Sequence, residues 1–347
     1  MNPFRKLRYI PSGKVLLDTA FSRASKLTLP KSKRATHIRA REREIAKLKL
    51  VQEVLCSRLE EIVKHFPSFD QIHPFYSTLA ETVVSVDQVR QALASVSTSI
   101  RVIKGIIQDS RRKLSKAQTT IEARQLRRAA YGRISSIFRR LDPRLETIQL
   151  AAKEYRRFPS IRLELPVIVV AGFPNVGKSS FVAQISSAQP EVAEYPFTTK
   201  GISVGHFPLD PLGGQILDLP GLLDRPMAKR NPIEQRAIAA IQYLADCIVF
   251  LIDPTWACGY ELTSQLSLLH EIQGTFPSVE VFPFLNKIDI ANKEEITRAT
   301  ELLGVEVVPL ISTLTGEGVK QAFEGIVNQS MSIKAKQEIL QKQHLQP

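Results

Sequence analysis

The residues VIVVAGFPNVGKSS, at positions 167–180, determine the architecture that we expect. VIVVAG is an unbroken apolar run, which predicts a buried strand. GFPNVGKSS has the spacing G-x-x-x-x-G-K-[ST] of a loop that binds phosphate between a strand and a helix. Gly172 and Gly177 let backbone N–H groups turn toward a phosphate, Lys178 reaches its β and γ oxygens, and the Ser179 hydroxyl binds Mg²⁺. The stretch therefore predicts a nucleotide-binding α/β domain.

Further apolar strands follow this loop, and most are preceded by a helical segment. Strands that alternate with helices predict a sheet that is covered on both faces. We expect six strands in a mixed, mainly parallel sheet. The strands after the first are ISVGHF (202–207), GQILDLP (214–220), DCIVFLID (246–253), VEVFPFLN (279–286) and VEVVPLIS (305–312).

Two motifs after the phosphate loop have the order and spacing of a GTP-binding switch. YPFTTK (195–200) precedes a strand, and its Thr199 can offer a hydroxyl to Mg²⁺ and an N–H to the γ-phosphate. DLPG places Asp218 at a strand end, where it can hold a Mg²⁺-bound water, while the Gly221 N–H meets the γ-phosphate. We expect Lys178, Thr199 and Gly221 to act in catalysis, and Ser179, Thr199 and Asp218 to bind the metal.

Two more motifs predict a guanine pocket. In NKID, Asp289 accepts hydrogen bonds from N1–H and the exocyclic amine of guanine, the Lys287 stem packs on the ring, and Asn286 ties the loop together. STL (312–314) can donate a backbone N–H to guanine O6. The five motifs in this order predict a P-loop GTPase that binds GTP or GDP. The expected nucleotide-binding residues are Gly172, Phe173, Pro174, Asn175, Val176, Gly177, Lys178, Ser179, Ser180, Thr199, Asp218, Pro220, Gly221, Leu222, Asn286, Lys287, Asp289, Ser312 and Thr313.

Leu222 follows Gly221, at a position where a polar side chain could orient the attacking water. Leucine cannot hydrogen-bond to water, so we expect unaided hydrolysis on the order of 10⁻³ s⁻¹ or below. It stays open whether Leu222 is only a packing residue while another group orients the water. Asn175 has two interpretations: it helps to hold a K⁺ ion near the β/γ bridge, or it only stabilises the loop.

The N-terminal half of the chain is basic. Residues 1–160 hold 33 of the 47 Lys and Arg residues but only 14 of the 34 Asp and Glu residues. Such asymmetry indicates a polyanionic partner, although a solvated helix face is the alternative. We expect an extended arm over the first 30 residues, then a helical bundle whose helices include residues 35–66, one opened by a capping box at Ser85, residues 119–141, and one starting at Pro143. The predicted domains are a basic helical domain at 1–160, a GTPase domain at 161–330 and a polar tail at 331–347.

Composition limits the cellular setting. The three cysteines, Cys56, Cys247 and Cys258, have neither a zinc spacing nor an even number, so we expect no disulfide. Apolar runs fall short of the ~20 residues that a transmembrane helix needs. The basic N-terminus is a poor secretory signal. We therefore expect a cytoplasmic monomer without a membrane partner.

The motifs together resemble the Obg-related translation GTPases, and more specifically the nucleolar GTP-binding protein (Nog) family. The resemblance implies a GTPase that joins the maturing large ribosomal subunit and contacts ribosomal RNA. Because the chain ends soon after the base pocket, it resembles the short archaeal form. The matching segments are GFPNVGKSSF, YPFTTKGISVGHF, DLPGLLDRP, NKID, FPSFDQIHPFYSTL (66–79), RQLRRAAYGRISSIFRR (124–140) and CGY (258–260).

Three functions remain in competition. The first is a slow GTPase of large-subunit assembly that docks on rRNA, with the arginines 124, 127, 128 and 133 as a phosphate-contacting stripe. The second is a GTPase of the same class that acts on tRNA or at a membrane surface. The third is a structural ribosomal factor with a decayed nucleotide site.

Overall fold

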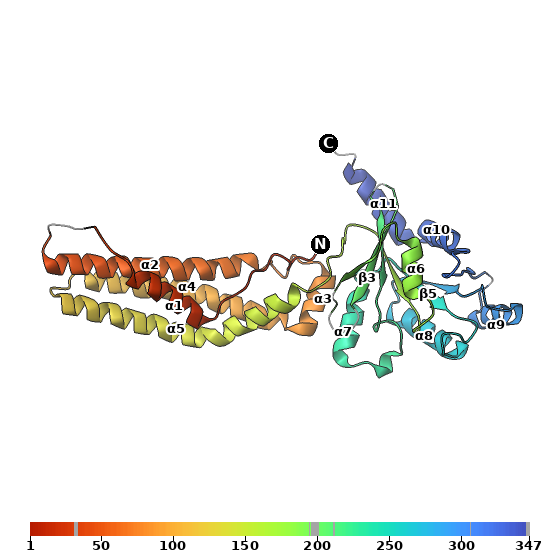
Figure 1. Cartoon of the computed structure of the whole chain (residues 1–347), viewed down its shortest axis with the longest axis horizontal. Helices are drawn as coiled ribbons and strands as arrows, with labels where there is room; N and C mark the ends of the chain where they lie inside the picture. Colours follow the sequence, from red (N-terminus) through yellow and green to blue (C-terminus); the bar gives the residue numbers. More distant parts are fainter. Residues whose placement is uncertain (31–33, 194, 196–200, 211, 306, 345–347) are drawn as a thin grey trace. The chain divides into compact units, whose positions relative to one another are not determined.

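A computed structural model describes residues 1–30, 34–193, 195, 201–210, 212–305 and 307–344. The chain forms two compact units (Figure 1). The helical unit contains Pro3–Ile72 and Val83–Arg156, and the sheet unit contains Met1–Asn2, His73–Thr82 and Arg157–Pro347. A compact unit need not be an independently folding domain. We therefore propose, as the sequence predicts, domain limits at residues 160 and 330.

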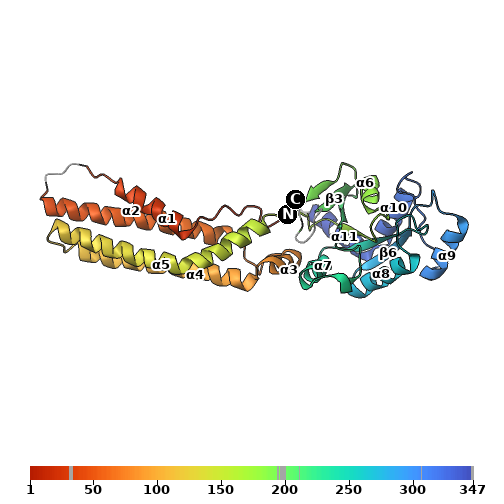
Figure 2. The same cartoon turned by 60° about the horizontal axis from the view of Figure 1, so that its bottom comes forward.

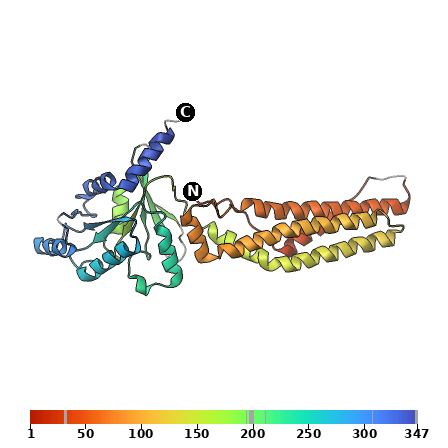
Figure 3. The ribbon, with the colours of Figure 1, turned by 180° about the vertical axis from the view of Figure 1, so that it is seen from behind.

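Four helices lie side by side in the helical unit, which confirms the predicted all-α class (Figures 1 and 3). Their apolar residues recur at helical spacing and face one another, as Leu48, Leu55 and Leu59 show, each 0% exposed. The helices are α1 (Gly13–Ser25), α2 (Thr36–His65), α4 (Val86–Leu114) and α5 (Thr120–Tyr155).

The predicted extended arm is wrong for residues 13–25, which form α1. Ser12 caps this helix, because its hydroxyl accepts the Val15 N–H at 3.4 Å. The Asp142 carboxylate of α5 accepts the Gly13 N–H at 2.8 Å. The signal was local, a serine before an apolar-periodic segment, but Pro11 and Gly13 obscured it.

Two further helix boundaries differ from the prediction. Pro143 does not start a helix but lies inside the continuous α5. It lacks the N–H that would bond to the Arg139 carbonyl, yet burial of Leu141 and Leu145 on either side holds the helix together. Ser85 is the N-cap position of α4, as expected, but its side chain makes no capping hydrogen bond.

The sheet unit has a six-stranded sheet with the order β2-β3-β4-β1-β5-β6. β1, β4, β5 and β6 are parallel, while β2 and β3 are antiparallel to their neighbours, so the sheet is mixed and mainly parallel, as predicted. The strands are β1 (Val167–Ala171), β2 (Glu191–Ala193), β3 (Ile202–Phe207), β4 (Gly214–Asp218), β5 (Cys247–Ile252) and β6 (Glu280–Leu285).

Helices cover both faces of this sheet, with α6 and α10 on one face and α7 and α8 on the other (Figure 2). The carboxyl ends of the four parallel strands therefore share one edge, where ligand sites of open α/β sheets lie. The helices of this unit are α3 (Pro74–Val83), α6 (Lys178–Ile185), α7 (Pro232–Ile241), α8 (Leu262–Thr275), α9 (Lys293–Leu303), α10 (Val319–Gln329) and α11 (Met331–His344), with a 3₁₀ turn at Met227–Lys229.

The six strands are not quite the six that the sequence predicts. The segment 305–312 makes only one isolated parallel bridge among its described residues, Leu285 with Leu310. Pro309 has no N–H to donate to β6, which limits this pairing. The short β2 takes the sixth place instead, paired with β3 at the opposite edge; its exposed residues gave no apolar pattern in the sequence.

Two helices at the ends of the sheet unit are anchored by polar contacts. In α3, the Tyr76 hydroxyl donates to the Pro159 carbonyl at 2.8 Å and accepts the Ile161 N–H at 3.1 Å. In α11, Lys336 Nζ lies 2.6 Å from Asp246 Oδ2. The described part of the predicted polar tail is thus a packed helix. Within the described residues, no helix is both long and apolar enough to cross a membrane.

Candidate nucleotide site

The phosphate loop after β1 has a backbone that only glycine can adopt at two positions. Gly172 has φ 132° and Gly177 has φ 102°. A Cβ atom on Gly172 would lie 2.5 Å from the Leu251 carbonyl oxygen, and one on Gly177 would lie 2.3 Å from Asn286 Nδ2. The loop is therefore pressed against the ends of two neighbouring strands, and it leads directly into α6, whose N-terminus favours anions.

A cavity of about 610 Å³ opens at this loop. It brings together most of the predicted phosphate-side and metal residues. Asp224, which the sequence analysis did not single out, also lines it. The lining residues are Pro174, Asn175, Gly177, Lys178, Ser179, Ser180, Asp218, Pro220, Gly221 and Asp224.

Lys178 and Asn175 shape the cavity from the phosphate loop. Lys178 is 9% exposed, and its ammonium donates to the carbonyls of Gly172 at 2.9 Å and Phe173 at 2.8 Å. Asn175 has φ 64°, in the left-handed region that asparagine tolerates better than most residues. A buried ammonium that lies beside the phosphate loop can pair with an incoming anionic phosphate.

The two described residues of the predicted metal set are in contact. The Ser179 hydroxyl donates to Asp218 Oδ2 at 2.6 Å. Asp218 is 1% exposed, and its Oδ1 has no hydrogen-bond partner among the described residues. An unpartnered buried carboxylate oxygen beside a serine hydroxyl fits Mg²⁺, which takes oxygen ligands and usually keeps several waters. Thr199, the third predicted ligand, lies outside the described residues.

Burial raises the pKa of the Asp218 carboxyl, and the nearby Asp224 carboxylate adds to the rise, while Ser179 and Lys178 partly counteract it. A raised folded-state pKa means that ionised Asp218 destabilises the metal-free protein. This cost is absent below the unfolded pKa of about 3.9 and is complete once the pH exceeds the raised pKa.

We predict that Asp218→Asn separates stability from binding. In EDTA at pH 7 the variant should melt at a higher temperature than the wild type, because the buried charge is gone. The difference should shrink as the pH falls through the raised pKa toward the unfolded value of about 3.9, because wild-type Asp218 becomes protonated. Nucleotide binding should lose its dependence on Mg²⁺. Thermal melts and binding assays with and without Mg²⁺ measure both effects, with the exposed Asp210→Asn as the control; a variant that melts lower in EDTA would contradict this account.

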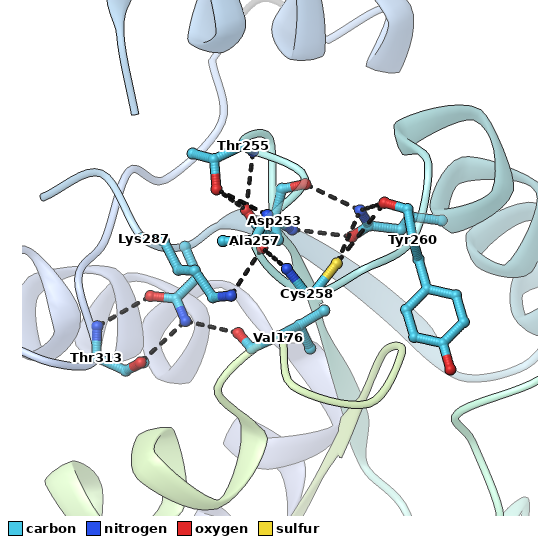
Figure 4. A network of polar contacts seen from close by, with 10 residues as sticks. Val176, Asp253, Thr255, Ala257, Cys258, Tyr260, Lys287 and Thr313 are labelled. Carbon is cyan, nitrogen blue, oxygen red and sulfur yellow. Dashed lines mark hydrogen bonds and ion pairs between the residues drawn. The ribbon is translucent and has the colours of Figure 1, made fainter. Parts of the chain in front are cut away.

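Asn286 joins the phosphate loop to the base loops. Its Nδ2 donates to the Val176 carbonyl at 2.7 Å and to Thr313 Oγ1 at 2.9 Å. Its Oδ1 accepts the Thr313 N–H at 2.9 Å. These contacts tie the phosphate loop at Val176 to Thr313, two residues that Figure 4 labels in this network. They also account for the close approach at Gly177.

The predicted guanine-binding carboxylate stands at the exposed edge of this network. Ser312 is buried, and its hydroxyl donates to Asp289 Oδ1 at 2.5 Å, which orients the exposed Asp289. The Ser312 N–H donates to Glu317 and the Thr313 N–H to Asn286. These two N–H groups would have to change partner to reach guanine O6, the contact that the sequence predicts for an N–H of residues 312–314.

Asp253 is a positioning residue that the sequence analysis missed. It is 0% exposed, and its Oδ2 lies 2.8 Å from Lys287 Nζ, the lysine that is predicted to pack on the base. Burial raises its pKa, but hydrogen bonds from Lys287 and Thr255 outweigh burial and leave the pKa lowered. Asp253 also accepts the Cys258 N–H at 2.7 Å (Figure 4). Its place directly after a buried strand was the signal that could have identified it.

The segment CGY (258–260) supports the same site. Buried Gln265 accepts the Asp253 N–H at 2.9 Å and donates to the Tyr260 carbonyl at 3.1 Å. The Tyr260 ring lies 4.4 Å, between centroids, from the ring of Phe173 in the phosphate loop. Asp253, Gln265 and Tyr260 thus form one connected group that contacts Lys287 and the phosphate loop.

The loop after β4 differs in detail from the predicted γ-phosphate sensor. The Gly221 N–H donates to Asp224 Oδ2 at 2.8 Å. Leu222 is 0% exposed, so its side chain is packed away from the cavity. Arg230 donates to the carbonyls of Gly221 at 3.0 Å and Arg225 at 2.6 Å. The described residues therefore hold this loop in a conformation that satisfies the Gly221 N–H and the carbonyls of Gly221 and Arg225.

The proposed arginine stripe of the helical unit is only partly formed. Arg127 pairs with buried Glu44 and lies 4.8 Å from the centroid of the Tyr131 ring. Arg133 pairs with Asp109 at 3.6 Å and falls on the opposite side of α5 from Arg124, since nine residues at about 100° each give a half turn. Exposed Arg124, Arg128 and Arg139 share one face of α5, and exposed Arg133, Arg140 and Arg144 share the opposite one.

Comparison with known proteins gives a consistent set of matches. Residues 4–162 match the family model described as "NOG1 N-terminal helical domain", and residues 232–289 match "Nucleolar GTP-binding protein 1 (NOG1)". A Drosophila melanogaster protein named nucleolar GTP-binding protein 1 is 32% identical over 361 residues, 99% of this chain and 55% of the relative. The Saccharomyces cerevisiae protein of that name is 33% identical over 86% of this chain and 47% of its own length.

A Methanocaldococcus jannaschii protein described as uncharacterized is 33% identical over 298 residues, 85% of this chain and 83% of the archaeal protein. The chain thus spans about half the length of the two eukaryotic relatives but most of the length of the archaeal one.

Proposed function

Because the chain belongs to the nucleolar GTP-binding protein 1 family, we propose that it is a GTP-binding switch that hydrolyses GTP slowly and acts in large-subunit ribosome assembly by docking on rRNA. One observation carries the nucleotide part of this proposal: Asn286 hydrogen-bonds to both the phosphate loop and Thr313, and Gly177 lies against it. The loop that would bind the triphosphate and the segments that would bind guanine are thus joined through hydrogen bonds of Asn286.

The proposed roles follow from where each group lies. Lys178 and the N–H groups of the phosphate loop bind the phosphates, and Asp289, oriented by Ser312, selects guanine. Ser179 and Asp218 would hold Mg²⁺, which neutralises charge on the β- and γ-phosphates when it is bound. Thr199 keeps its predicted role as metal ligand and γ-phosphate sensor. Gly172, Phe173, Val176 and Pro220 shape the loops around the nucleotide.

We predict slow hydrolysis that depends on potassium. The buried Leu222 side chain offers the water no hydrogen bond, so single-turnover hydrolysis should proceed on the order of 10⁻³ s⁻¹ or below. If Asn175 helps to hold K⁺, the rate should be higher in KCl than in NaCl, and Asn175→Ala should remove the difference. The exposed Asn328→Ala is the control. Equal rates of the wild type in both salts would exclude a K⁺ role for Asn175.

RNA docking is proposed on the basis of the charge of the helical unit. Arg124, Arg128 and Arg139 project from one face of α5 within about 60° of each other, at 100° per residue. Side chains so placed can contact successive phosphates without reading bases. The proposal that the large ribosomal subunit is the target rests on the family resemblance. The printed name of the relatives mentions only GTP binding and the nucleolus, and it does so for those proteins. A cytoplasmic, monomeric state stays a prediction for this chain.

We predict that binding to folded large-subunit rRNA fragments weakens steeply with salt. Replacement of the three α5 arginines by glutamine should reduce the slope of log K against log salt by up to about 3, because each lost phosphate contact releases about 0.9 fewer counterions. Filter binding at several salt concentrations measures this slope. A matched triple change in the sheet unit, at exposed Lys293, Arg298 and Lys320, is the control. An equal loss in both triple variants would contradict docking through α5.

A further inference from the structure

Asp224 faces the phosphate cavity from the loop that follows β4. We propose that Asp224 determines the affinity for GTP relative to GDP, because its carboxylate occupies the Gly221 N–H that the γ-phosphate would use. This inference rests on the proposed GTP-binding function and adds a specificity-determining residue to it.

The central observation is the 2.8 Å hydrogen bond from the Gly221 N–H to Asp224 Oδ2. A single backbone N–H in good geometry serves one strong acceptor, so carboxylate and γ-phosphate compete for it. Both are anions, and the Asp224 side chain is only 16% exposed. Like charges in a partly desolvated site repel each other, so the carboxylate must move when a triphosphate enters. GDP has no γ-phosphate and leaves this contact intact.

The released carboxylate has a second position available. Asp224 Oδ1 and Arg230 Nε are both buried, and neither has a hydrogen-bond partner among the described residues. Oδ1 already lies 3.9 Å from the Arg230 guanidinium. A small rotation of Asp224 would shorten this long ion pair into a direct hydrogen bond and satisfy both groups. The loop therefore has two arrangements, with Asp224 on Gly221 when the γ-phosphate is absent and on Arg230 when it is present.

Arg230 is held in place by the turn, so that only the Asp224 side chain has to move between the two arrangements. The Arg230 side chain is 1% exposed, and it already donates to the carbonyls of Gly221, three residues before Asp224, and of Arg225, directly after it. These bonds fix the guanidinium relative to the turn in both arrangements. The cost of moving Asp224 is then mainly its charge-assisted bond to Gly221, which is of a size that shifts binding about tenfold or more.

The test is the affinity of the full chain for GDP and for a non-hydrolysable GTP analogue, measured with fluorescent nucleotides and Mg²⁺. We expect Asp224→Ala to bind the GTP analogue about tenfold more tightly than the wild type, with GDP binding within about twofold. Asp224→Asn, which keeps an acceptor but loses the charge, should fall between the two. The exposed Asp210→Ala removes the same charge from the turn between β3 and β4 and should change neither affinity.

Each alternative result overturns the inference in a different way. If Asp224→Ala retains GDP binding but its affinity for the GTP analogue is unchanged or weaker, Asp224 does not compete with the γ-phosphate. If only its single-turnover hydrolysis rate falls, Asp224 orients water in place of Leu222 and is a catalytic residue instead. If the wild type binds neither nucleotide, the proposed function itself fails, and the inference with it.

Discussion

Replacing Gly177 by alanine should weaken the binding of both GTP and GDP by about 100-fold or more, because two effects add. The φ of 102° at Gly177 is a backbone conformation that alanine adopts only with strain. The new Cβ would also lie 2.3 Å from Asn286 Nδ2 and 2.7 Å from Thr313 Oγ1. Relief of this clash requires Asn286 to release the phosphate loop, so the phosphate and base contacts are lost together.

The effect of Gly177→Ala is measured as nucleotide affinity, with circular dichroism to show that the fold is retained. Gly325→Ala is the matched control in the same unit. Gly325 lies in α10, where nothing comes within 4 Å of an added Cβ, so alanine should leave binding unchanged and stabilise the helix slightly. Binding by Gly177→Ala within about threefold of the wild type would show that the tight contact at Asn286 does not govern the site.

Asp289→Asn should abolish the preference for guanine. The carboxylate is expected to accept two hydrogen bonds from the base, and each such charge-assisted bond is worth about 1.5–3 kcal/mol, so GTP affinity should fall on the order of 10²–10⁴-fold. ATP binding, weak from the start, should change little. Competition between GTP and ATP for a fluorescent nucleotide measures the ratio.

Ser312→Ala separates guanine recognition by the Asp289 carboxylate from the orientation of that carboxylate by the Ser312 hydroxyl. The Ser312 hydroxyl orients Asp289 through their 2.5 Å hydrogen bond but does not itself meet the base. Its loss should therefore reduce GTP affinity by a smaller factor, about tenfold, and leave guanine preferred. An unchanged ratio of GTP to ATP affinity in Asp289→Asn would mean that guanine is recognised elsewhere.

The site could be predicted from the sequence where the chemistry imposes fixed spacing on contiguous residues. Gly172, Gly177 and Lys178 follow one strand in a pattern with few other uses, and the structure brings Gly177 and Lys178 to one cavity with Asp218 and Ser179. Asn286 and Thr313 follow two later segments and meet because those segments end at the same edge of the sheet.

Residues that act through three-dimensional contacts could not be found in this way. Asp253 is one carboxylate after a strand, and only the folded chain shows that it holds Lys287. Asp224 follows Gly221 by three residues, a spacing without meaning until the turn brings the two together. Arg127 looked like a free cation in the sequence, yet a buried Glu44 on another helix neutralises it.

Long-range packing also overrode local signals in the fold. Pro143 is an ordinary helix start in the sequence, but apolar residues on both sides of it keep α5 continuous. The apolar segment 305–312 was expected to be a strand from its composition, whereas Pro309 and its place at the sheet edge leave it with one bridge among the described residues.

Isothermal titration calorimetry of the purified chain with GTP, in Mg²⁺ and then in EDTA, tests the central claim most directly. We predict one GTP bound per chain in Mg²⁺, clearly weaker binding in EDTA, and no comparable heat from ATP. Absence of GTP binding in Mg²⁺, or equal binding of GTP and ATP, would contradict the assignment of this cavity as a guanine-nucleotide site.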